Sequence, residues 1–407
     1  MKKVWLTKPL RSVCDLQNGY AFKSSDYIES SNTLNTRMSS IRPDGSFDPE
    51  HNQRFLPDYY AKEYSSFLLN EGDLIIAMTD MAGDPKILGV PTLVSNQNGR
   101  NFLMNQRVGK LFGFSDNVRV PFLRYFLTSP SIKEFYKSKG AGGLQINISK
   151  ADILSAQIPL PAIAEQDRIV GILDEAFDGI ATAKASAEKN LQNARALFES
   201  HLQSVFTQRG KGWEDRTLDQ VCIVERGSSP RPIKKYFTTN SDGVNWIKIG
   251  DTEEGGKYVY STAQKITPVG SKQSRYVKEG DFILTNSMSF GRPYIMKTSG
   301  YIHDGWFVLR LNASIDTDYF YYLLSSRFIQ SQFARLACGA VVKNISGDLV
   351  KKAVLPIPPL THQHVIVKKL LELSAETQHL EAIYQCKLTA LDELKKSLLH
   401  DAFRGAL

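Results

Sequence analysis

The sequence predicts an α+β protein in which one plan, a mixed α/β globular region followed by a long helix, occurs twice. Three observations carry this prediction. The stretch 163–206 recurs as 360–403 at a constant offset of 197 (360 − 163 = 197). Both copies lack proline and are rich in helix-forming residues. The segment before each copy has short apolar runs separated by turn residues, which is typical of a globular region.

Composition limits the class of protein. The chain has 407 residues, enough for more than one domain, and a net charge of +8 that permits nucleic acid as a partner without requiring it. We see no signal peptide and no apolar run of the roughly 18 residues that a membrane span needs, so we expect a cytoplasmic protein. The cysteines form no C-x-x-C pair and indicate neither a zinc site nor a disulfide framework: Cys14, Cys222, Cys338 and Cys386.

The first globular region is predicted at 1–158. Residues 67–78 are expected to form two strands joined by a turn at Glu71-Gly72, and the apolar spacing of 121–137 suits one or two short helices. Pro159 and Pro161 then fix an extended entrance to the first long helix.

The first long helix is predicted at 159–208, and its apolar residues follow mostly alternating steps of 4 and 3, as in a coiled coil. One phase slip occurs between Ala187 and Leu191. A helix of about 40 residues would be roughly 60 Å long. The seam comprises Ile169, Leu173, Ala176, Ile180, Ala183, Ala187, Leu191, Ala194, Phe198 and Val205.

The second globular region, at 209–355, repeats the first at low similarity. The correspondences Gly19 with Gly227, Gly83 with Gly291 and Pro85 with Pro293 share an offset of 208. Later correspondences have an offset of 197, so the first region should carry 11 more residues (208 − 197 = 11) between Pro85 and Pro121.

The second long helix, at 356–407, repeats the seam and its phase slip. The first seam is rich in alanine and the second in leucine, so the helices should pack on each other, small side chains against large ones. The second seam comprises Ile366, Leu370, Leu373, Thr377, Leu380, Tyr384, Leu388, Leu391 and Leu398.

Motifs for catalysis are missing from the sequence. There is no nucleotide-binding P-loop, no motif for amino-methyl transfer and no acidic nuclease cluster followed by Glu-x-Lys. His362 and His364 could bind a metal, but their counterparts in the first half are Glu165 and Asp167, so a role at the start of the helix is favoured. Gln166 and Gln363 occupy one position in both copies and suit a polar contact there.

Basic and amide side chains suited to DNA recur in both globular regions, with aromatic residues interleaved. Arginine suits bidentate contact with guanine, and asparagine or glutamine with adenine. Any one of these residues could instead be a solvated charge, and the case rests on the set recurring twice. The candidates are Lys23, Arg37, Arg42, Arg54, Lys86, Arg100, Asn105, Gln106 and Arg107 in the first region, and Arg226, Ser228, Arg231, Lys234, Lys235, Lys248, Asn286, Arg292 and Lys297 in the second.

The whole chain resembles the specificity subunit of type I restriction–modification enzymes. The likeness rests on Leu160-Pro161 through Glu165-Gln166 to Ile169-Val170, on the repeat of this pattern from Ile357, and on the ending 398–407. His362 departs from the family, which usually has glutamate beside the glutamine.

The resemblance implies two target recognition domains, each of which reads half of a split, asymmetric DNA site. It implies that the long helices pack antiparallel, as a pseudo-twofold spacer that sets the distance between half-sites and seats two methyltransferase subunits. Restriction subunits can join the complex. S-adenosylmethionine belongs to the methyltransferase subunits, so this chain should need no cofactor or metal and should not be catalytic. The spacer and partner-docking positions would be Gln166, Ile169, Leu173, Leu191, Gln363, Ile366, Leu370 and Leu388.

Two alternatives assign the chain to another functional class, an enzyme or a scaffold. A single-chain DNA methyltransferase or nuclease with its own recognition domains would need the catalytic motifs that are missing. A coiled-coil scaffold that binds no DNA would not need the variable basic segments.

Overall fold

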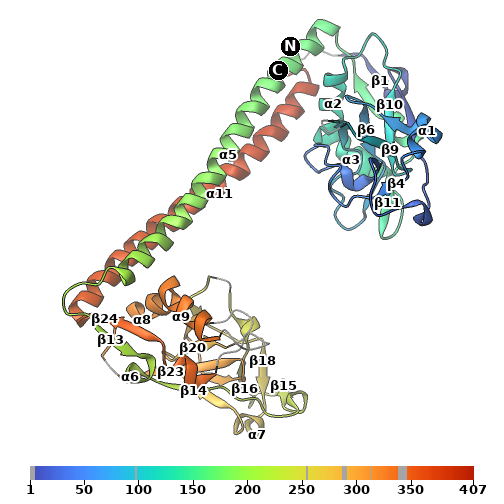
Figure 1. The fold of residues 1–407 in the computed structure, drawn as a ribbon. Helices are drawn as coiled ribbons and strands as arrows, with labels where there is room; N and C mark the ends of the chain where they lie inside the picture. The colour runs from blue at the N-terminus through green and yellow to red at the C-terminus, as the bar shows by residue number, and fades with distance from the viewer. Residues whose placement is uncertain (1–4, 97–98, 254, 287–290, 313, 338–345) are drawn as a thin grey trace. The chain divides into compact units, whose positions relative to one another are not determined.

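The computed structural model describes residues 5–96, 99–253, 255–286, 291–312, 314–337 and 346–407 (Figure 1). The chain forms two compact units. One combines residues 1–187 with 386–407, and the other is the continuous stretch 188–385. Cys338 and Phe290 lie outside the described residues. In the described part of the chain, no helix has the length and apolar character that a membrane span requires.

The first unit contains two four-stranded sheets, and short helices cover them. One sheet has the order β2-β10-β6-β8, and the other β4-β3-β9-β5. Two further strand pairs are β1 with β12 and β7 with β11. The strands are β1 Thr7–Pro9, β2 Asp15–Asn18, β3 Thr33–Thr36, β4 Phe55–Leu56, β5 Leu68–Leu69, β6 Leu74–Ala77, β7 Thr79–Met81, β8 Pro91–Leu93, β9 Asn101–Met104, β10 Val108–Phe112, β11 Gln145–Asn147 and β12 Gln157–Pro159. The helices are α1 Tyr60–Glu63, α2 Val120–Thr128, α3 Pro130–Lys139 and α4 Lys150–Leu154.

The second unit repeats this arrangement with five strands in each main sheet, β14-β23-β20-β21-β17 and β15-β18-β16-β22-β19, and a pair β13 with β24. The strands are β13 Glu214–Thr217, β14 Cys222–Arg226, β15 Phe237–Thr238, β16 Val244–Ile247, β17 Tyr258–Val259, β18 Gln264–Ile266, β19 Arg275–Val277, β20 Phe282–Thr285, β21 Pro293–Met296, β22 Gly300–Ile302, β23 Trp306–Leu311 and β24 Val354–Ile357. The helices are α6 Leu218–Val221, α7 Pro268–Ser271, α8 Thr317–Ser325, α9 Arg327–Ala337 and α10 Gly347–Val350.

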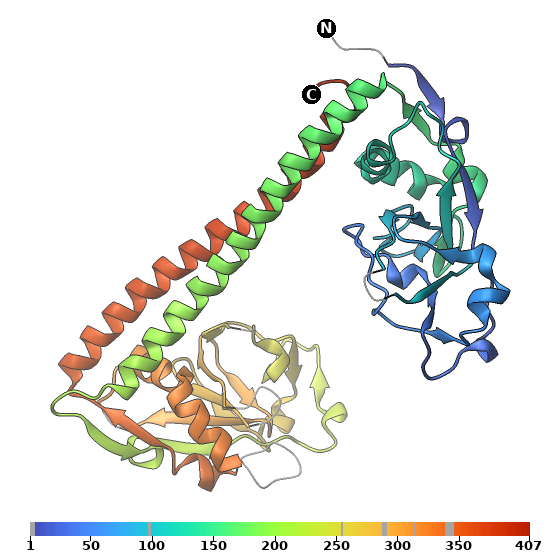
Figure 2. The same ribbon diagram turned by 45° about the horizontal axis from the view of Figure 1, so that its top comes forward.

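The two long helices are α5 Ile163–Thr207 and α11 Leu360–Phe403, as the sequence predicts. Within each unit they lie side by side and run in opposite directions (Figure 1, Figure 2). In the first unit, Ile169 near the start of α5 shares a core with Leu399 near the end of α11. In the second unit, Leu202 shares a core with Leu370. The antiparallel pairing is therefore confirmed in both units.

The predicted seams are also confirmed. Every seam residue on α5 is buried or half-buried, and Leu202, which the prediction passed over, is buried as well. On α11 the exception is Leu380, which is 38% exposed. At the phase slips, Ala187 is buried, while Leu191, Tyr384 and Leu388 are half-buried.

Two predicted correspondences between the two globular regions are wrong, Pro85 with Pro293 and Gly83 with Gly291. Strand pairing places Pro91 opposite Ile76 and Pro293 opposite Leu284, so Pro293 is equivalent to Pro91 and not to Pro85. Likewise Gly291 is equivalent to Gly89, because each donates a backbone hydrogen bond to the last residue of an equivalent strand, Thr285 of β20 or Ala77 of β6. The extra residues of the first region are therefore distributed over several loops, which a comparison of isolated glycines and prolines could not resolve.

A close backbone approach is repeated in both units and requires glycine. A Cβ atom added to Gly19 would lie 2.2 Å from the carbonyl oxygen of Asn105, and one added to Gly227 would lie 2.1 Å from that of His303. These glycines hold the loops before β10 and β23 against the ends of β2 and β14.

Replacing Gly227 by alanine should therefore destabilise the second unit by about 2 kcal/mol or more, because the backbone must move to relieve the overlap. Gly19→Ala should do the same in the first unit. Gly250→Ala is the matched control, since a Cβ atom there would meet nothing within 4 Å. Urea unfolding of the three variants measures the difference, and equal midpoints would contradict the packing argument.

Candidate nucleic-acid interface

Each globular region presents a tight turn just before a central strand, at residues 105–107 in the first and 303–305 in the second. In both, the last residue of the turn accepts a backbone hydrogen bond from the residue that follows the adjacent strand, β6 or β20: Met78 N–H to Arg107 and Asn286 N–H to Gly305, each 2.9 Å. The two turns are thus built by the same backbone contacts, yet they carry different side chains, Asn-Gln-Arg against His-Asp-Gly.

A basic residue lies beside each turn, at the end of a neighbouring strand. The parallel pairs β3 with β9 and β16 with β22 end level with the turns. The next residue along β3 is Arg37, and along β16 it is Lys248; each precedes a 3-10 turn. A second basic residue stands four positions after the repeated glycine contact in both regions: Lys23 after Gly19 and Arg231 after Gly227.

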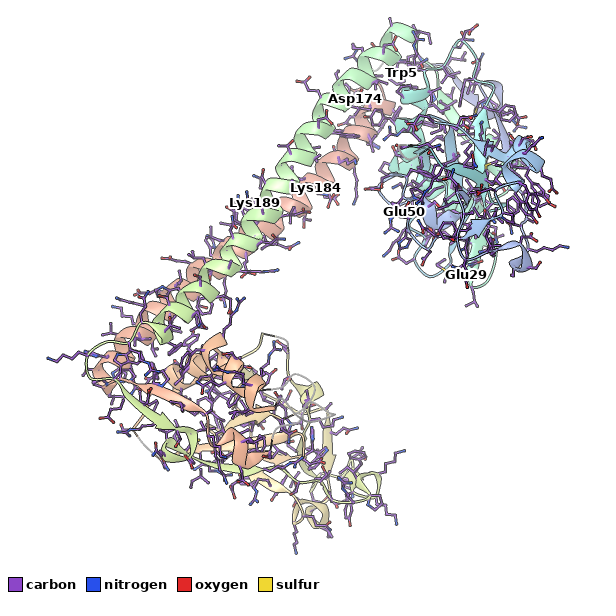
Figure 3. The ribbon with its side chains drawn as sticks, viewed as in Figure 1. Trp5, Glu29, Glu50, Asp174, Lys184 and Lys189 are labelled. Atoms are coloured by element: carbon purple, nitrogen blue, oxygen red, sulfur yellow. The ribbon has the colours of Figure 1, made fainter. Side chains whose placement is uncertain are left out.

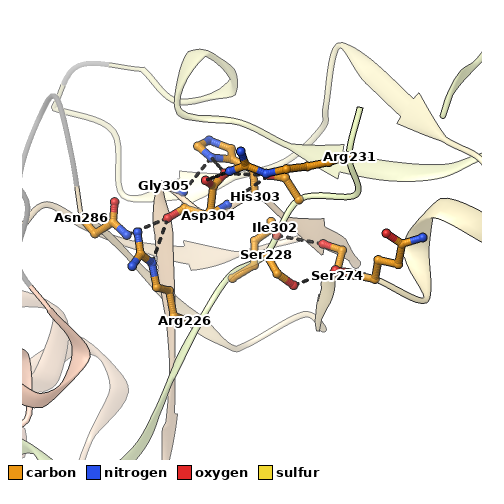
Figure 4. Close-up of polar contacts among 11 residues, drawn as sticks. Arg226, Ser228, Arg231, Ser274, Asn286, Ile302, His303, Asp304 and Gly305 are labelled. Atoms are coloured by element: carbon orange, nitrogen blue, oxygen red, sulfur yellow. Dashed lines mark hydrogen bonds and ion pairs between the residues drawn. The ribbon is translucent and has the colours of Figure 1, made fainter. Parts of the chain in front are cut away.

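Asp304 is the centre of a polar cluster in the second region (Figure 4). Its carboxylate accepts hydrogen bonds from Ser229 Oγ at 2.6 Å and from Arg231 at 3.3 Å. Its backbone carbonyl accepts from Asn286 Nδ2 at 2.7 Å and from Arg226 Nε at 3.3 Å. The Ser229 hydrogen bond is the main cause that lowers the pKa of Asp304, with smaller contributions from neighbouring His303 and Arg231. The fixed carboxylate suits the amino groups of base edges, and the exposed arginines suit phosphates.

His303 is held in a neutral form that fits its surroundings. Its Nδ1 accepts a hydrogen bond from the Gly305 N–H at 2.8 Å, which places the ring proton on Nε2. Burial is the main cause that lowers the pKa of His303, and nearby Lys248 lowers it further, although Asp304 opposes both. The ring therefore braces the turn as a neutral acceptor.

A pocket of about 880 Å³ opens beside this cluster. Trp246, Phe237 and Ile233 supply apolar surface, and Arg231, Lys234 and Lys248 supply positive charge. Flat apolar surface beside cations suits a nucleobase with its phosphate.

The structure brings together most of the candidates in the second region. Arg226, Arg231 and Asn286 contact Asp304, while Lys234 and Lys248 line the pocket. Ser228 donates to the Gln273 carbonyl at 2.8 Å in the adjoining loop (Figure 4). Lys235 follows Lys234 in a 3-10 turn.

Two candidates of the second region lie elsewhere. Arg292 lines a separate cavity of about 890 Å³ together with Phe198 of α5 and Glu381 of α11. Lys297 lies 5.2 Å above the ring of Tyr258. Their assignment to DNA contact remains a prediction that this cluster does not strengthen.

The first region disperses its candidates more widely. Gln106 is exposed at its turn, Arg107 is half-buried, and the buried Asn105 side chain accepts from the Arg107 N–H at 3.2 Å, so Asn105 shapes the turn. Several basic residues already have acidic partners: Arg100 with Glu50 at 2.9 Å, Lys86 with Asp84 at 3.2 Å and Arg42 with Asp48 at 3.9 Å. Lys23 and Arg54 are exposed, and Arg37 is half-buried. Figure 3 labels Glu50 among the side chains of this region.

An aromatic cluster adjoins the first turn and was only partly predicted. Tyr20, which accepts the backbone N–H of Gln106, packs on Phe22 and Tyr64 with ring centres 5.0 and 4.7 Å apart. Tyr60 extends the cluster, and the neighbouring Tyr59 is 64% exposed. The sequence run Tyr59-Tyr60…Tyr64 was the available signal for these residues.

The two conserved-position glutamines close the start of each long helix. Gln166 accepts from the Arg119 N–H and donates to the carbonyls of Asn117 and Pro161. Gln363 accepts from the Asp316 N–H and donates to the Pro358 carbonyl. The predicted polar contact at the helix start is therefore confirmed.

The same burial corrects part of the predicted docking surface. Gln166, Gln363, Ile169, Leu173 and Leu370 are at most 1% exposed, so they join each helix to its own globular region and offer no surface to another subunit. Leu191, Ile366 and Leu388 are half-buried and keep some exposed surface.

The described residues contain neither a reactive buried cysteine nor a metal-binding cluster. Burial is the main cause that raises the pKa of both Cys14 and Cys222 to about 12, which leaves these thiols unreactive. Within the described ranges, no three His, Cys, Asp or Glu side chains are grouped to hold a metal ion.

Comparison with known proteins gives a consistent result. A family model described as the type I restriction modification DNA specificity domain matches residues 2–191 and 210–385. The type I restriction enzyme StySPI specificity subunit of Salmonella potsdam is 23% identical over 99% of this chain and 89% of its own length. The EcoBI specificity subunit of Escherichia coli is 22% identical over 99% of this chain and 86% of its own length.

Solved structures share the fold. A chain from a study described as "Structural basis underlying complex assembly and conformational transition of the type I R-M system" has a TM-score of 0.79 and 18% identity, and the match covers 99% of this chain and 98% of that one. The HsdS subunit of Thermoanaerobacter tengcongensis has a TM-score of 0.59 and 19% identity, with 99% and 97% covered.

The neutral acceptor role of His303 predicts a pH dependence. A histidine whose pKa is lowered in the folded state contributes stability above its ordinary pKa of 6.5, and this stability is lost as the pH falls below that value. The unfolding midpoint of the second unit should therefore drop between pH 7 and pH 5, and His303→Asn, which keeps an acceptor, should reduce the drop. His379→Asn, on the exposed side of α11, is the control. Identical pH profiles for wild type and His303→Asn would rule out this role.

Proposed function

Because the chain belongs to the type I restriction modification DNA specificity family, we propose that its two globular regions each read one part of a divided DNA sequence. The chain is the specificity subunit of a type I restriction–modification system, a non-catalytic, DNA-recognising member of such a complex. The proposal concerns how it recognises DNA and which partners it holds.

One observation carries the proposal: the same turn is built twice with different side chains. Gly19 and Gly227 fix both turns by the same backbone contacts, whereas Gln106 and Asp304 differ at equivalent positions. Two domains that recognise different DNA sequences require the same backbone support and different side chains at the turn. Because the tips differ, the target is asymmetric.

The side chains at the turns suggest their roles. Gln106 can contact adenine through two hydrogen bonds, and the Asp304 carboxylate can accept from the amino group of cytosine. Arg37, Lys23 and Lys248 would contact phosphates and position each turn in the groove, and Arg231 would hold the Asp304 carboxylate in place for the base that it reads. Exposed tyrosines in the first region and Phe237, which is 38% exposed, in the second add apolar surface.

The long helices would act as the spacer between the two readers and as the seat of the catalytic partners. We propose two methyltransferase subunits, which bind S-adenosylmethionine and extrude the target adenine, and restriction subunits that can join them. The internal repeat supports two equivalent seats, because each copy keeps an equivalent, partly exposed leucine on its long helix, Leu191 or Leu388. The alternative is a single chain with its own catalytic domain. The similarity of this chain to named specificity subunits argues against that alternative.

Methylation by the assembled complex tests the proposal. Co-expression of this chain with its methyltransferase subunit should yield one bipartite, asymmetric motif with adenine methylated on both strands, and the chain alone should yield none. Long-read sequencing of host DNA gives the motif. A continuous palindrome would refute the two-reader model.

A matched pair of variants localises the reading. Arg231→Ala should weaken or relax recognition in one half of the motif and leave the other half unchanged. Arg216→Ala, an exposed arginine paired with Glu214 at 2.7 Å outside the cluster, should leave both halves unchanged.

The spacer role makes a separate prediction. Inserting four residues after Leu191, and four after Leu388 to keep the helices matched, should lengthen both helices by about 6 Å. The gap between half-sites should change by one or two base pairs while the half-sites keep their sequence. The same sequencing assay reads out both, and an altered half-site would count against the spacer.

A further inference from the structure

We infer that α5 and α11 carry complementary charges that make the two halves of one chain pair with each other and oppose pairing between identical helices of two copies. The inference needs only the repeat and the ion pairs between the helices. It does not require that the chain reads DNA.

Two ion pairs join the helices, one in each unit. In the first unit, Lys184 Nζ lies 2.5 Å from Asp392 Oδ1. In the second, Arg195 Nε lies 2.8 Å from Glu381 Oε2. Lys184 is labelled on α5 in Figure 3. The residue numbers of each pair have the same sum (184 + 392 = 576 and 195 + 381 = 576), so both pairs follow one antiparallel register.

The repeat exchanges the two pairs and inverts their signs. At the offset of 197, Lys184 is equivalent to Glu381 (184 + 197 = 381), and Arg195 is equivalent to Asp392 (195 + 197 = 392). Both cations therefore lie on α5 and both anions on α11. Two ion pairs could equally have formed with one positive and one negative residue on each helix.

The distribution of charge decides which helices can pair. If α5 of one copy took the place of α11 in another, Arg195 would occupy the position of Asp392 and face Lys184. If α11 replaced α5, Glu381 would face Asp392. Two copies that paired α5 with α5 and α11 with α11 would thus form four like-charged contacts in place of four ion pairs. Like charges at such positions oppose association, in the manner of the e and g positions of coiled coils.

The sizes of the seam residues favour the same pairing. Ala183, Ala187 and Ala194 on α5 are equivalent to Leu380, Tyr384 and Leu391 on α11. Pairing α5 with α5 would set small residues against small ones, and pairing α11 with α11 would set large ones against large ones. Packing is worse in both cases, because small side chains facing each other leave space and large ones facing each other overlap.

The functional consequence, which does rest on the proposed function, is that two copies do not readily pair first half with first half or second half with second half. Such pairing would join two first regions or two second regions and so create symmetric DNA targets. The charge arrangement keeps one chain tied to one asymmetric target.

A charge swap in the full chain isolates the effect. Arg195→Glu with Glu381→Lys keeps net charge and retains an ion pair at both positions within the chain. Each helix then carries one charge of each sign, so identical helices can also form ion pairs. Reversing all four residues (Lys184→Glu, Arg195→Glu, Glu381→Lys and Asp392→Lys) keeps the like charges together and is the matched control.

Two differently tagged copies of each chain are co-expressed, and capture of one tag measures the other. An exposed ion pair changes an equilibrium by about two- to fivefold. With four contacts changed, the double swap should raise cross-capture at least about tenfold over wild type, and 0.5 M salt should reduce the gain. The fourfold reversal should match wild type.

Circular dichroism confirms that each chain folds, and Lys184→Glu with Asp392→Lys is an equivalent double swap if the first fails to fold. Double swaps that fold yet capture no more than wild type would overturn the inference, as would a fourfold reversal that captures as much as the double swaps. Because this assay uses no DNA, its outcome is independent of the methylation test.

Discussion

Each globular core depends on a helix end that arrives from far away in the sequence. In the first unit, Phe403 of α11 packs on Phe122 and Phe126 of α2, with ring centres 5.2 and 5.3 Å apart. In the second, Phe206 of α5 packs on Tyr319 of α8 at 5.6 Å. These aromatic contacts bury large side chains and fix the angle at which each long helix leaves its globular region. The glutamine hydrogen bonds at the opposite helix start, Gln166 and Gln363, secure the second attachment.

The regular parts of this architecture could be predicted from sequence because they follow simple periodicities. The seams of α5 and α11, the short helices at 120–139 and the strand–turn–strand around Gly72 all occur where the apolar spacing placed them. The sheet topology could not be predicted, since the order β2-β10-β6-β8 joins strands across long connections. The equivalence of Gly291 with Gly89 became visible only through strand pairing, because insertions of different sizes separate the conserved positions.

The sequence predicts which types of residue form the candidate interface better than it predicts where they lie in the fold. Arg226, Arg231 and Asn286 look unrelated along the chain, and Asp304, which gathers them, has no basic or aromatic signature of its own. In the first region, the ion pairs of Arg100 and Arg42 with acidic partners could not be foreseen from a count of positive charges. A DNA reader built on loops gives a weak sequence pattern, because each residue comes from a different strand end. The frame that holds the loops is the part that repeats.

The discontinuity of the first unit has a consequence for the order of folding. The second unit is one continuous stretch, 188–385, whereas the first combines 1–187 with 386–407. Leu399 and Ala402 are buried in the first core, so this core stays incomplete until almost the whole chain has left the ribosome. The second unit can complete its core earlier, although it is synthesised later. During synthesis, the N-terminal region therefore exposes apolar surface for longest, which makes it the part of the nascent chain most exposed to aggregation and to chaperones.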